Sequence, residues 1–490
     1  MLTIEQAVLS VLFGTLAFIV FVVVKGIAVW CWQSFVLRKM PEAPGGWPIL
    51  GHLWPLYWNT PWDLFTTWAL QAGDIVRLRI FNKHMVVISN PELCKRVLHT
   101  NLKNYAKDVG FTYGPFMPIL GSGLVTSEGA LWKKQRLLVS AAFRVEILDD
   151  IPAIARRSVD RLSAQLEEYR GSSVPVEMFT CFRHLTLQVI GEAVLSLPPE
   201  ESDRVFPYLY LPVMEESNRR VLEPWRSYIP TPEWFRYKKR LRQLDTYIIG
   251  LLKLRWTQRL SGEHKPAASK DIVDRVMDAI PEGEWGAAAQ RQLCYEIKTF
   301  VLAGHETSAS MLTFALYELT QNKTQLDKVR EEAVRVFGED EQTTPSRDAL
   351  NSMDYTVGVL KETLRLYSVV PVVTRAAVDK DTLGGYSIPA GTGIIICMQG
   401  VHHHPAVWKD PSKFDPARFV PPVETDNPYA FLPFIQGPRN CLGQHLALLE
   451  ARVVLALLAK RFDLTAVRKC VKDPHLVPIG PAQGLELLVR

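Results

Sequence analysis

FLPFIQGPRNCLGQH, residues 431–445, is the stretch of sequence on which the interpretation of the whole chain depends. It places Cys441 between a loop rich in proline and glycine and residues 442–461, whose apolar stripe is typical of a helix. Backbone N–H groups and the helix dipole stabilise a thiolate at such a helix start. Gly443 leaves the approach to the sulfur uncrowded, and Arg439 adds a cation suited to a carboxylate. The alternative is a buried structural cysteine, the usual case for a lone one.

Five residues of this stretch follow the spacing FxxGxRxCxG: Phe434, Gly437, Arg439, Cys441 and Gly443. This spacing resembles the signature of the cytochrome P-450 family of haem-thiolate monooxygenases. The resemblance implies heme b as the cofactor, with Cys441 as the axial ligand of its iron. It also implies that Phe434 and Gly443 lie against the cofactor.

A second motif is KETLR, in which Glu362 and Arg365 are three apart and can pair on one helix face. An exposed pair of this kind contributes little, and that is the alternative. The family buries the pair and joins it to a downstream arginine. FDPARF, residues 414–419, resembles that downstream segment, so Arg418 is expected to complete a buried structural network.

A third motif, AGHETS, begins at Ala303 in the middle of residues 287–321, whose apolar residues lie on nearly all sides as in a central buried helix. It resembles the oxygen-activation motif of the family. Ala303 and Gly304 are expected to leave room for a flat macrocycle and molecular oxygen. Glu306 and Thr307 are expected to act as the catalytic carboxylate and hydroxyl of a proton relay. Alternatively, the threonine hydroxyl merely bonds a carbonyl of its own helix.

A fourth motif, Trp132 and Arg136 in LWKKQR, resembles the WxxxR of the family. The resemblance implies that Arg136, Arg375 and Arg439 bind the haem propionates, with Trp132 donating its indole N–H. Weaker candidates for a propionate are Tyr105 and Lys107.

The order of helical and β-prone segments indicates a mainly α (α+β) fold with a minor sheet. Residues 73–90 predict a hairpin around Asn82-Lys83, and a second β-prone zone lies between Val370 and Cys397. No long linker divides the chain after residue 50. We therefore expect one P-450 haem-binding catalytic domain over residues 41–490, with an N-terminal membrane anchor over residues 1–40.

The anchor prediction depends on residues 8–24, a run of 17 residues without a charge. As a helix the run spans about 26 Å, slightly less than a hydrocarbon core of about 30 Å. A cleaved signal peptide is the alternative, but no basic residue precedes the run. Glu5 precedes the run and basic residues follow it, which places the catalytic domain in the cytosol as a single-pass protein. The endoplasmic reticulum membrane is expected, with another endomembrane or a plastid membrane as the alternative.

Composition excludes several classes of protein. The net charge is +5 over 490 residues, and lysine and arginine are scattered, so nucleic-acid binding is not expected. Seven widely spaced cysteines indicate a reducing compartment with no disulfide framework. Residues 402–404 are three consecutive histidines, which diverge in space and are interpreted as structural. The zinc-protease motif HExxH fails because Ala309 stands at its last position.

The chain has no flavin or NAD motif, so the electrons have to come from a partner. The resemblance points to NADPH–cytochrome P-450 reductase, with cytochrome b5 as a further candidate, and Lys133 and Lys134 could meet its acidic surface. The alternative is an ordinary solvated basic face. The expected reaction inserts one oxygen atom from O2 into a lipophilic fatty acid, terpenoid, sterol or carotenoid, by C–H hydroxylation or epoxidation. Rival functions are a P-450-type isomerase or dehydratase, for which the Glu306–Thr307 pair would not be needed, and a haem sensor without turnover.

Overall fold

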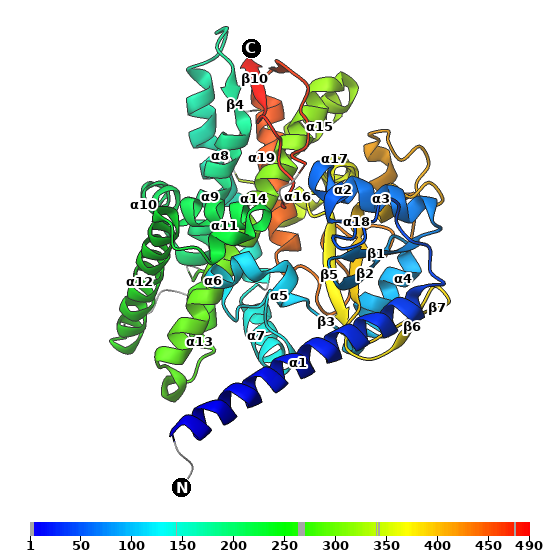
Figure 1. Ribbon diagram of the computed structural model, residues 1–490. Coiled ribbons are helices and arrows are strands. Elements are labelled where there is room, and N and C mark those ends of the chain that lie inside the picture. Colours follow the sequence, from blue (N-terminus) through cyan, green and yellow to red (C-terminus); the bar gives the residue numbers. More distant parts are fainter. Residues whose placement is uncertain (1–3, 144, 263–269, 340, 342–343, 475–476) are drawn as a thin grey trace. The chain divides into compact units, whose positions relative to one another are not determined.

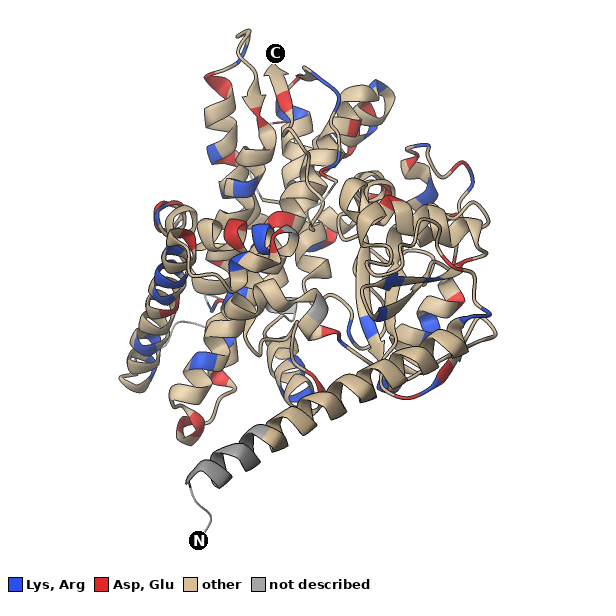
Figure 2. Cartoon of the chain, in the orientation of Figure 1, with Lys and Arg blue, Asp and Glu red and all other residues tan. Residues whose placement is uncertain are grey.

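The computed structural model describes residues 4–143, 145–262, 270–339, 341, 344–474 and 477–490 of the chain. It is mainly helical with small sheets, which confirms the predicted fold class. The chain forms two compact units, one of Met1–Ala106 with Val372–Gly400 and one of Lys107–Pro371 with Val401–Arg490. Lysines and arginines are spread over many elements, as the composition predicts, and several lie along α12 (Pro232–Leu260) (Figure 2).

The first unit begins with the predicted anchor helix, α1 (Ile4–Leu37), which continues through Lys25 without a break. Phe13–Leu37 is long and apolar enough to cross a membrane. Its C-terminal part is attached to the folded unit, because Gln33 Nε2 donates to the carbonyl of Ala390 at 2.8 Å and Ser34 Oγ lies 2.8 Å from His84 Nε2. The end of the anchor is therefore part of the folded unit.

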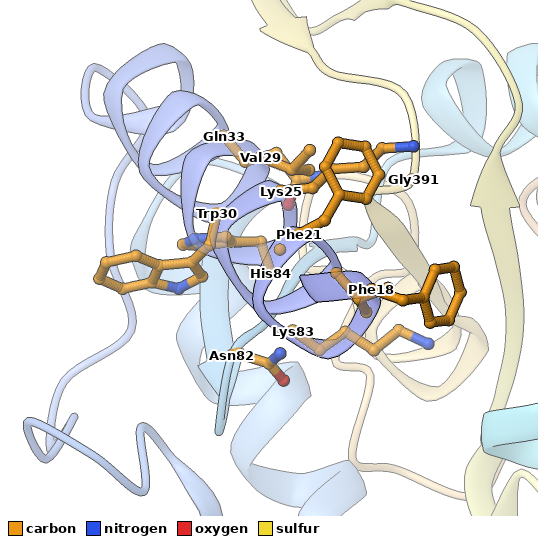
Figure 3. A pocket seen from close by; sticks show the side chains of 12 residues that line it. Phe18, Phe21, Lys25, Val29, Trp30, Gln33, Asn82, Lys83, His84 and Gly391 are labelled. Atoms are coloured by element: carbon orange, nitrogen blue, oxygen red, sulfur yellow. The ribbon is translucent and has the colours of Figure 1, made fainter. Parts of the chain in front are cut away.

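A groove of about 700 Å³ lies between α1 and the hairpin that contains His84. Phe18 and Phe21 extend from α1 on one side of it, and Lys83 lies across from them (Figure 3). Trp30 also lines the groove and stacks on the His84 ring, with 6.1 Å between centroids.

A five-stranded sheet forms the centre of this unit, with the strand order β1-β2-β8-β5-β3. Its strands are β1 (Ile75–Ile80), β2 (Lys83–Ile88), β8 (Gly393–Cys397), β5 (Val372–Ala377) and β3 (Tyr105–Ala106). The β2–β8 pairing is parallel and the other pairings are antiparallel. β6 (Asp381–Leu383) and β7 (Tyr386–Ile388) form a separate hairpin. Both predicted β zones are confirmed.

The first hairpin turns one residue earlier than the sequence predicted. Phe81 and Asn82 form the turn, Phe81 takes a φ of 51°, and Lys83 already pairs with Ile80. The sequence predicted the turn at Asn82-Lys83 from the two flanking β-rich runs, but the pairing register places Lys83 in β2, whose remaining residues are all buried.

Helices cover the sheet. They are α2 (Leu53–Trp58), α3 (Pro61–Gln71), α4 (Pro91–Lys95), η1 (Arg96–Thr100) and η2 (Leu102–Asn104). Phe65 and Trp68 of α3 pack with Val87, Ile395 and Cys397 in one apolar core. α18 (Met398–His402) leads from this unit into the second.

The second unit is built around α14 (Ala287–Gln321), which matches the predicted central helix residue for residue (Figure 1). α14 packs against α9 (Met178–Leu195), α12, α17 (Asp354–Tyr367) and α19 (Gln444–Arg461). The remaining helices of at least seven residues are α7 (Gly129–Ala142), α8 (Val145–Glu167), α10 (Pro199–Val205), α11 (Leu211–Leu222), α13 (Ile272–Asp278) and α15 (Lys323–Phe337). Shorter elements are α5 (Val109–Thr112), η3 (Gly114–Phe116), α6 (Met117–Leu120), η4 (Phe206–Tyr210), η5 (Pro224–Ser227), η7 (Glu282–Glu284), α16 (Arg347–Asn351) and η8 (Pro416–Phe419).

The C-terminus is tied to α9 through Glu177. Its carboxylate caps α9 by accepting the N–H groups of Phe179 and Thr180, and it also accepts the N–H of Leu485 at 2.8 Å. The strand β10 (Glu486–Val489) begins directly after Leu485. It lies between β4 (Val176–Glu177) and β9 (Leu464–Ala466) in a three-stranded sheet.

Candidate functional site

The loop before Cys441 has the tight geometry that its glycines predict. Gly437 takes a φ of 84°, and its carbonyl accepts the N–H of Asn440 at 3.0 Å. The N–H of Cys441 donates to the carbonyl of Phe434 at 2.8 Å, which closes the loop three residues before α19. Cys441 therefore stands at the start of a helix, as the sequence predicts.

α7 brings two predicted residues to this loop. Arg136 donates to the carbonyl of Asn440 at 2.9 Å and to its side-chain Oδ1 at 2.6 Å. The guanidinium of Arg439 lies 3.8 Å from the centroid of the Trp132 ring, which is a cation–π contact. The structure thus gathers Trp132, Arg136, Arg439 and Cys441 in one place.

Arg439 already has a carboxylate partner from the chain. It forms an ion pair with Glu128 and donates to the carbonyl of Ser127 at 2.9 Å. Glu128 also accepts the N–H of Lys107 at 3.0 Å. Sequence reasoning missed Glu128 and Asn440, because neither residue belongs to a motif and only the folded chain places them beside the arginines.

The Cys441 thiol is held between two opposing influences. Desolvation raises its pKa, whereas the backbone N–H of Gly443, the charge of Arg136 and the backbone N–H of Gln444 all lower the pKa. Cys441 nevertheless keeps accessible surface, and a Cβ added at Gly443 would meet no atom within 4 Å. Residue Cys441 is therefore accessible, although protein surrounds its thiol.

One face of α14 is accessible at Ala303, and the neighbouring face is buried. Ala303 is exposed although Val301 and His305 are buried, so the helix is accessible at this point. A Cβ added at Gly304 would lie 2.8 Å from Cδ1 of Ile190 on α9. The missing side chain of Gly304 therefore lets α9 pack closely against α14.

Glu306 and Thr307 make different contacts. Glu306 Oε1 lies 3.7 Å from Nη2 of Arg183 on α9. Desolvation raises the pKa of Glu306, the Arg183 charge lowers it, and the charge of Glu215 raises it. Thr307 donates to the carbonyl of Ala303 at 2.6 Å, which is the helical contact considered as the alternative. Arg183 was not predicted because it lies far from AGHETS in the sequence.

The network of Glu362, Arg365 and Arg418 forms as the sequence predicts. Arg365 donates to both carboxylate oxygens of Glu362, at 2.7 and 2.8 Å, and both side chains are fully buried. Arg418 Nε donates to Glu362 Oε1 at 3.3 Å. Arg365 also donates to the carbonyls of His402, Pro411 and Lys413.

His402 links this network to the cysteine loop. Its Nε2 accepts the N–H of Leu432 at 2.8 Å, so Nδ1 carries the hydrogen that donates to Ser368 Oγ at 2.9 Å. Burial holds the pKa of His402 well below its usual value, in keeping with a neutral ring. The structural interpretation of the three histidines agrees with these contacts, and no group of metal-ligating side chains occurs among the described residues.

The other propionate candidates have partners of their own. Arg375 lies buried on β5 and donates to the carbonyl of Thr374 at 2.7 Å. The Tyr105 hydroxyl donates to Asp381 Oδ2 at 2.5 Å, beside Arg96 and Asn101. Lys107 donates to the carbonyl of Val125.

α19 also contains a buried carboxyl that was not predicted. Glu450 is 2% exposed, its Oε2 lies 3.5 Å from Ser308 Oγ, and its Oε1 has no protein partner. Desolvation raises the pKa of Glu450 to about 8. The carboxyl is therefore neutral at pH 7 and connects α19 to the AGHETS segment.

Comparisons with known proteins agree on one family. The family model described as Cytochrome P-450 matches residues 41–481. Protein LUTEIN DEFICIENT 5, chloroplastic, of Arabidopsis thaliana is 29% identical over 92% of this chain and 76% of its own length. Secologanin synthase 1 of Catharanthus roseus is 31% identical over 82% and 78%, respectively. The crystal structure of the cytochrome P-450DA heme domain has the same fold, with a TM-score of 0.79, 24% identity, and coverage of 92% of this chain and 96% of that one.

The cofactor of that family is haem with a cysteine thiolate ligand, and the residues of the second unit fit it. Cys441 is accessible and receives N–H groups and an arginine charge that favour the thiolate. Arg439, stacked on Trp132, already binds a carboxylate, which is the chemical group of a propionate. Ala303 leaves the central helix accessible.

Arg365→Ala should destabilise the protein strongly, because Glu362 would stay buried without its cation. Breaking a buried pair costs about 3–5 kcal/mol, so we expect a much lower thermal unfolding midpoint and a lower haem content. The matched control is Arg204→Ala, whose partner Glu201 is also three residues away but lies in a solvent-exposed pair. Equal midpoints for the two variants would contradict a buried structural network.

Glu450→Gln should stabilise the protein near neutral pH. The folded chain keeps this proton up to about pH 8, while the unfolded chain releases it near 4.5, so the free energy of unfolding falls as pH rises between these values. Removing the ionisable group should add about 1–3 kcal/mol at pH 7 and flatten the pH dependence. Thermal midpoints from about pH 5 to 8 measure this, with the exposed Glu331→Gln as the control. An unchanged pH dependence would show that Glu450 is already ionised in the folded protein.

Proposed function

Because the chain belongs to the cytochrome P-450 family of haem monooxygenases, we propose that Cys441 supplies the axial thiolate to its haem iron. The observation that carries this proposal is that Cys441 is an accessible residue whose thiol interacts with the N–H groups of Gly443 and Gln444 and with the Arg136 charge. We also propose that residues 1–40 are the membrane anchor and residues 41–490 the catalytic domain. In support, α1 ends at Leu37 and the family match begins at residue 41.

The proposed haem-binding residues act through charge and shape. Arg136, Arg439 and Arg375 bind the propionates, and Trp132 orients Arg439 through the stacked contact at 3.8 Å. Phe434, whose carbonyl accepts the N–H of Cys441, and Gly443, two residues after Cys441, shape the approach to the sulfur. The small side chain of Ala303 leaves room beside α14 for oxygen and substrate. Gly304 contributes by letting α9 pack closely against α14.

When bound, the haem supplies the activation of molecular oxygen and the oxidation of the substrate. In this proposal the protein supplies protons and position. The Glu306 carboxyl, whose pKa burial raises, holds a proton, and the Thr307 hydroxyl passes it toward the oxygen-binding side. Thr307 can do this because its oxygen keeps acceptor capacity while its hydrogen is directed at the carbonyl of Ala303.

We propose a lipophilic substrate of the fatty acid, terpenoid, sterol or carotenoid class, oxidised by C–H hydroxylation or epoxidation. The membrane-spanning length of Phe13–Leu37 supports a substrate that partitions into a membrane. The names of two relatives, which refer to lutein and to secologanin, support the terpenoid and carotenoid classes.

We propose that the electrons come from NADPH–cytochrome P-450 reductase, with cytochrome b5 as a second donor. The proposed location is the endoplasmic reticulum membrane with the catalytic domain in the cytosol. A plastid membrane is the alternative, and the chloroplastic relative supports it.

The test of the assignment is the absorption spectrum of the reduced, carbon-monoxide-bound protein. We expect a thiolate-type band for the wild type and its loss in Cys441→His, because imidazole donates less electron density to the iron. In Thr307→Ala, product per NADPH should fall about tenfold or more while the thiolate band stays. A thiolate band that survives in Cys441→His would refute Cys441 as the ligand.

Lys133→Glu with Lys134→Glu tests the reductase surface. Lys134 pairs with Glu284 at 3.1 Å, so Lys133 is the more available charge. If this end of α7 docks an acidic partner, the double variant should slow reduction and weaken its dependence on ionic strength. The control is Lys238→Glu with Lys239→Glu on α12, and equal behaviour of the two variants would exclude docking through α7.

A further inference from the structure

A group of buried polar atoms without protein partners lies on the α9 side of α14. Among the described residues, both ring nitrogens of His305, the hydroxyl of Tyr210 and Nε of Arg183 have no hydrogen-bond partner. His305 is 0% exposed and Tyr210 is 1% exposed. Their rings meet edge to face, with 6.2 Å between centroids. His305 and Tyr210 therefore lie together inside the second unit, and Arg183 interacts electrostatically with both of them.

Such atoms are costly to bury. Leaving a buried donor or acceptor unsatisfied costs about 1–3 kcal/mol, and protein interiors satisfy the great majority of them with protein groups or ordered water. A neutral imidazole has one donor and one acceptor, so His305 needs two partners. A site with several convergent polar atoms is the kind of place where buried water binds.

The site is adjacent to the proposed proton donor. Arg183 lies 3.7 Å from the Glu306 carboxylate and is itself part of the group of unpartnered atoms. Tyr210 interacts electrostatically with Glu306 and Arg183, and His305 interacts with Arg183. The side chains of Arg183 and Glu306 are 23% and 15% exposed, so the pair is partly accessible to solvent.

The protonation states suit proton transfer. Burial, together with the charges of Arg183 and His184, holds the pKa of His305 well below its usual value, so the ring is neutral. Burial and the charge of Glu306 raise the pKa of Tyr210, so its hydroxyl keeps its hydrogen. A neutral imidazole can accept a proton at one nitrogen and release another from the second.

We propose that His305 and Tyr210 hold ordered water beside the Arg183–Glu306 pair, and that this water returns protons to Glu306 from the α9 side of α14. The inference rests on the proposed proton-donor role of Glu306. One water proton moves to the Glu306 carboxylate, and a proton from bulk solvent, entering past Arg183, restores the water. His305 and Tyr210 are positioning residues, since they act through the water and Glu306.

The test uses two variants of the haem-loaded, full-length protein. Tyr210→Phe removes only the hydroxyl, and His305→Phe replaces the ring by an apolar one of similar shape. The first readout is the infrared carboxyl band of Glu306, identified by its loss in Glu306→Gln. In both variants we expect the band to shift and its hydrogen–deuterium exchange to slow about tenfold.

The second readout is the solvent deuterium isotope effect on reductase-supported turnover. It should rise in both variants with KM unchanged, because proton resupply becomes slower while substrate binding does not change. Tyr237→Phe is the matched control, since Tyr237 is also buried. Its hydroxyl lies 3.2 Å from Ser217 Oγ, which is not one of the groups of this site. This variant should leave both readouts unchanged.

The outcomes separate this inference from the function on which it rests. If Glu306→Gln uncouples NADPH use from product while Tyr210→Phe changes neither the infrared band nor the isotope effect, the water site is refuted and the role of Glu306 stands. If Glu306→Gln leaves coupling intact, the role of Glu306 itself is refuted. Should His305→Phe fail to take up haem, Tyr210→Phe alone decides.

Discussion

The buried pair between Glu362 and Arg365 is the interaction on which the segments around the cysteine loop depend. Both side chains are fully buried, and Arg365 also donates to three backbone carbonyls of the segment between His402 and Lys413. His402 then accepts the N–H of Leu432 at the start of the cysteine loop. A buried charge pair is seldom stabilising compared with apolar residues, so its value here is that it fixes the course of these segments. Through His402, this network holds the loop that contains Cys441 in place.

The electrostatics of Cys441 follow from the same geometry. Burial favours the neutral thiol, and the helix start and Arg136 favour the thiolate. A metal ion decides between the two forms, because binding replaces the proton. The arginines nearby are held by groups of the chain, Arg136 by Asn440 and Arg439 by Trp132 and Glu128, so their positions are set independently of a ligand.

The central helix α14 has two functional faces. Ala303 opens one face, while the other packs closely on α9 because Gly304 has no side chain to keep Ile190 away. Glu306 reaches Arg183 on this second side, where His305 and Tyr210 add further polar atoms. α14 therefore has an accessible position at Ala303 and a polar region on the side that faces α9.

Local spacing along the chain was enough to predict several features of this protein. These are the cysteine before a helix, the Glu362–Arg365 pair three residues apart, the extent of α14 and the long apolar helix at the N-terminus, since each follows from the geometry of a single segment. Packing between distant segments set which groups meet across the fold. It placed Arg439 on Trp132, His402 between Arg365 and Leu432, Ile190 against Gly304, and Arg183 beside Glu306. The reason is physical: local periodicity sets which face a side chain occupies, but its partner is set by how distant helices pack, which no single segment encodes.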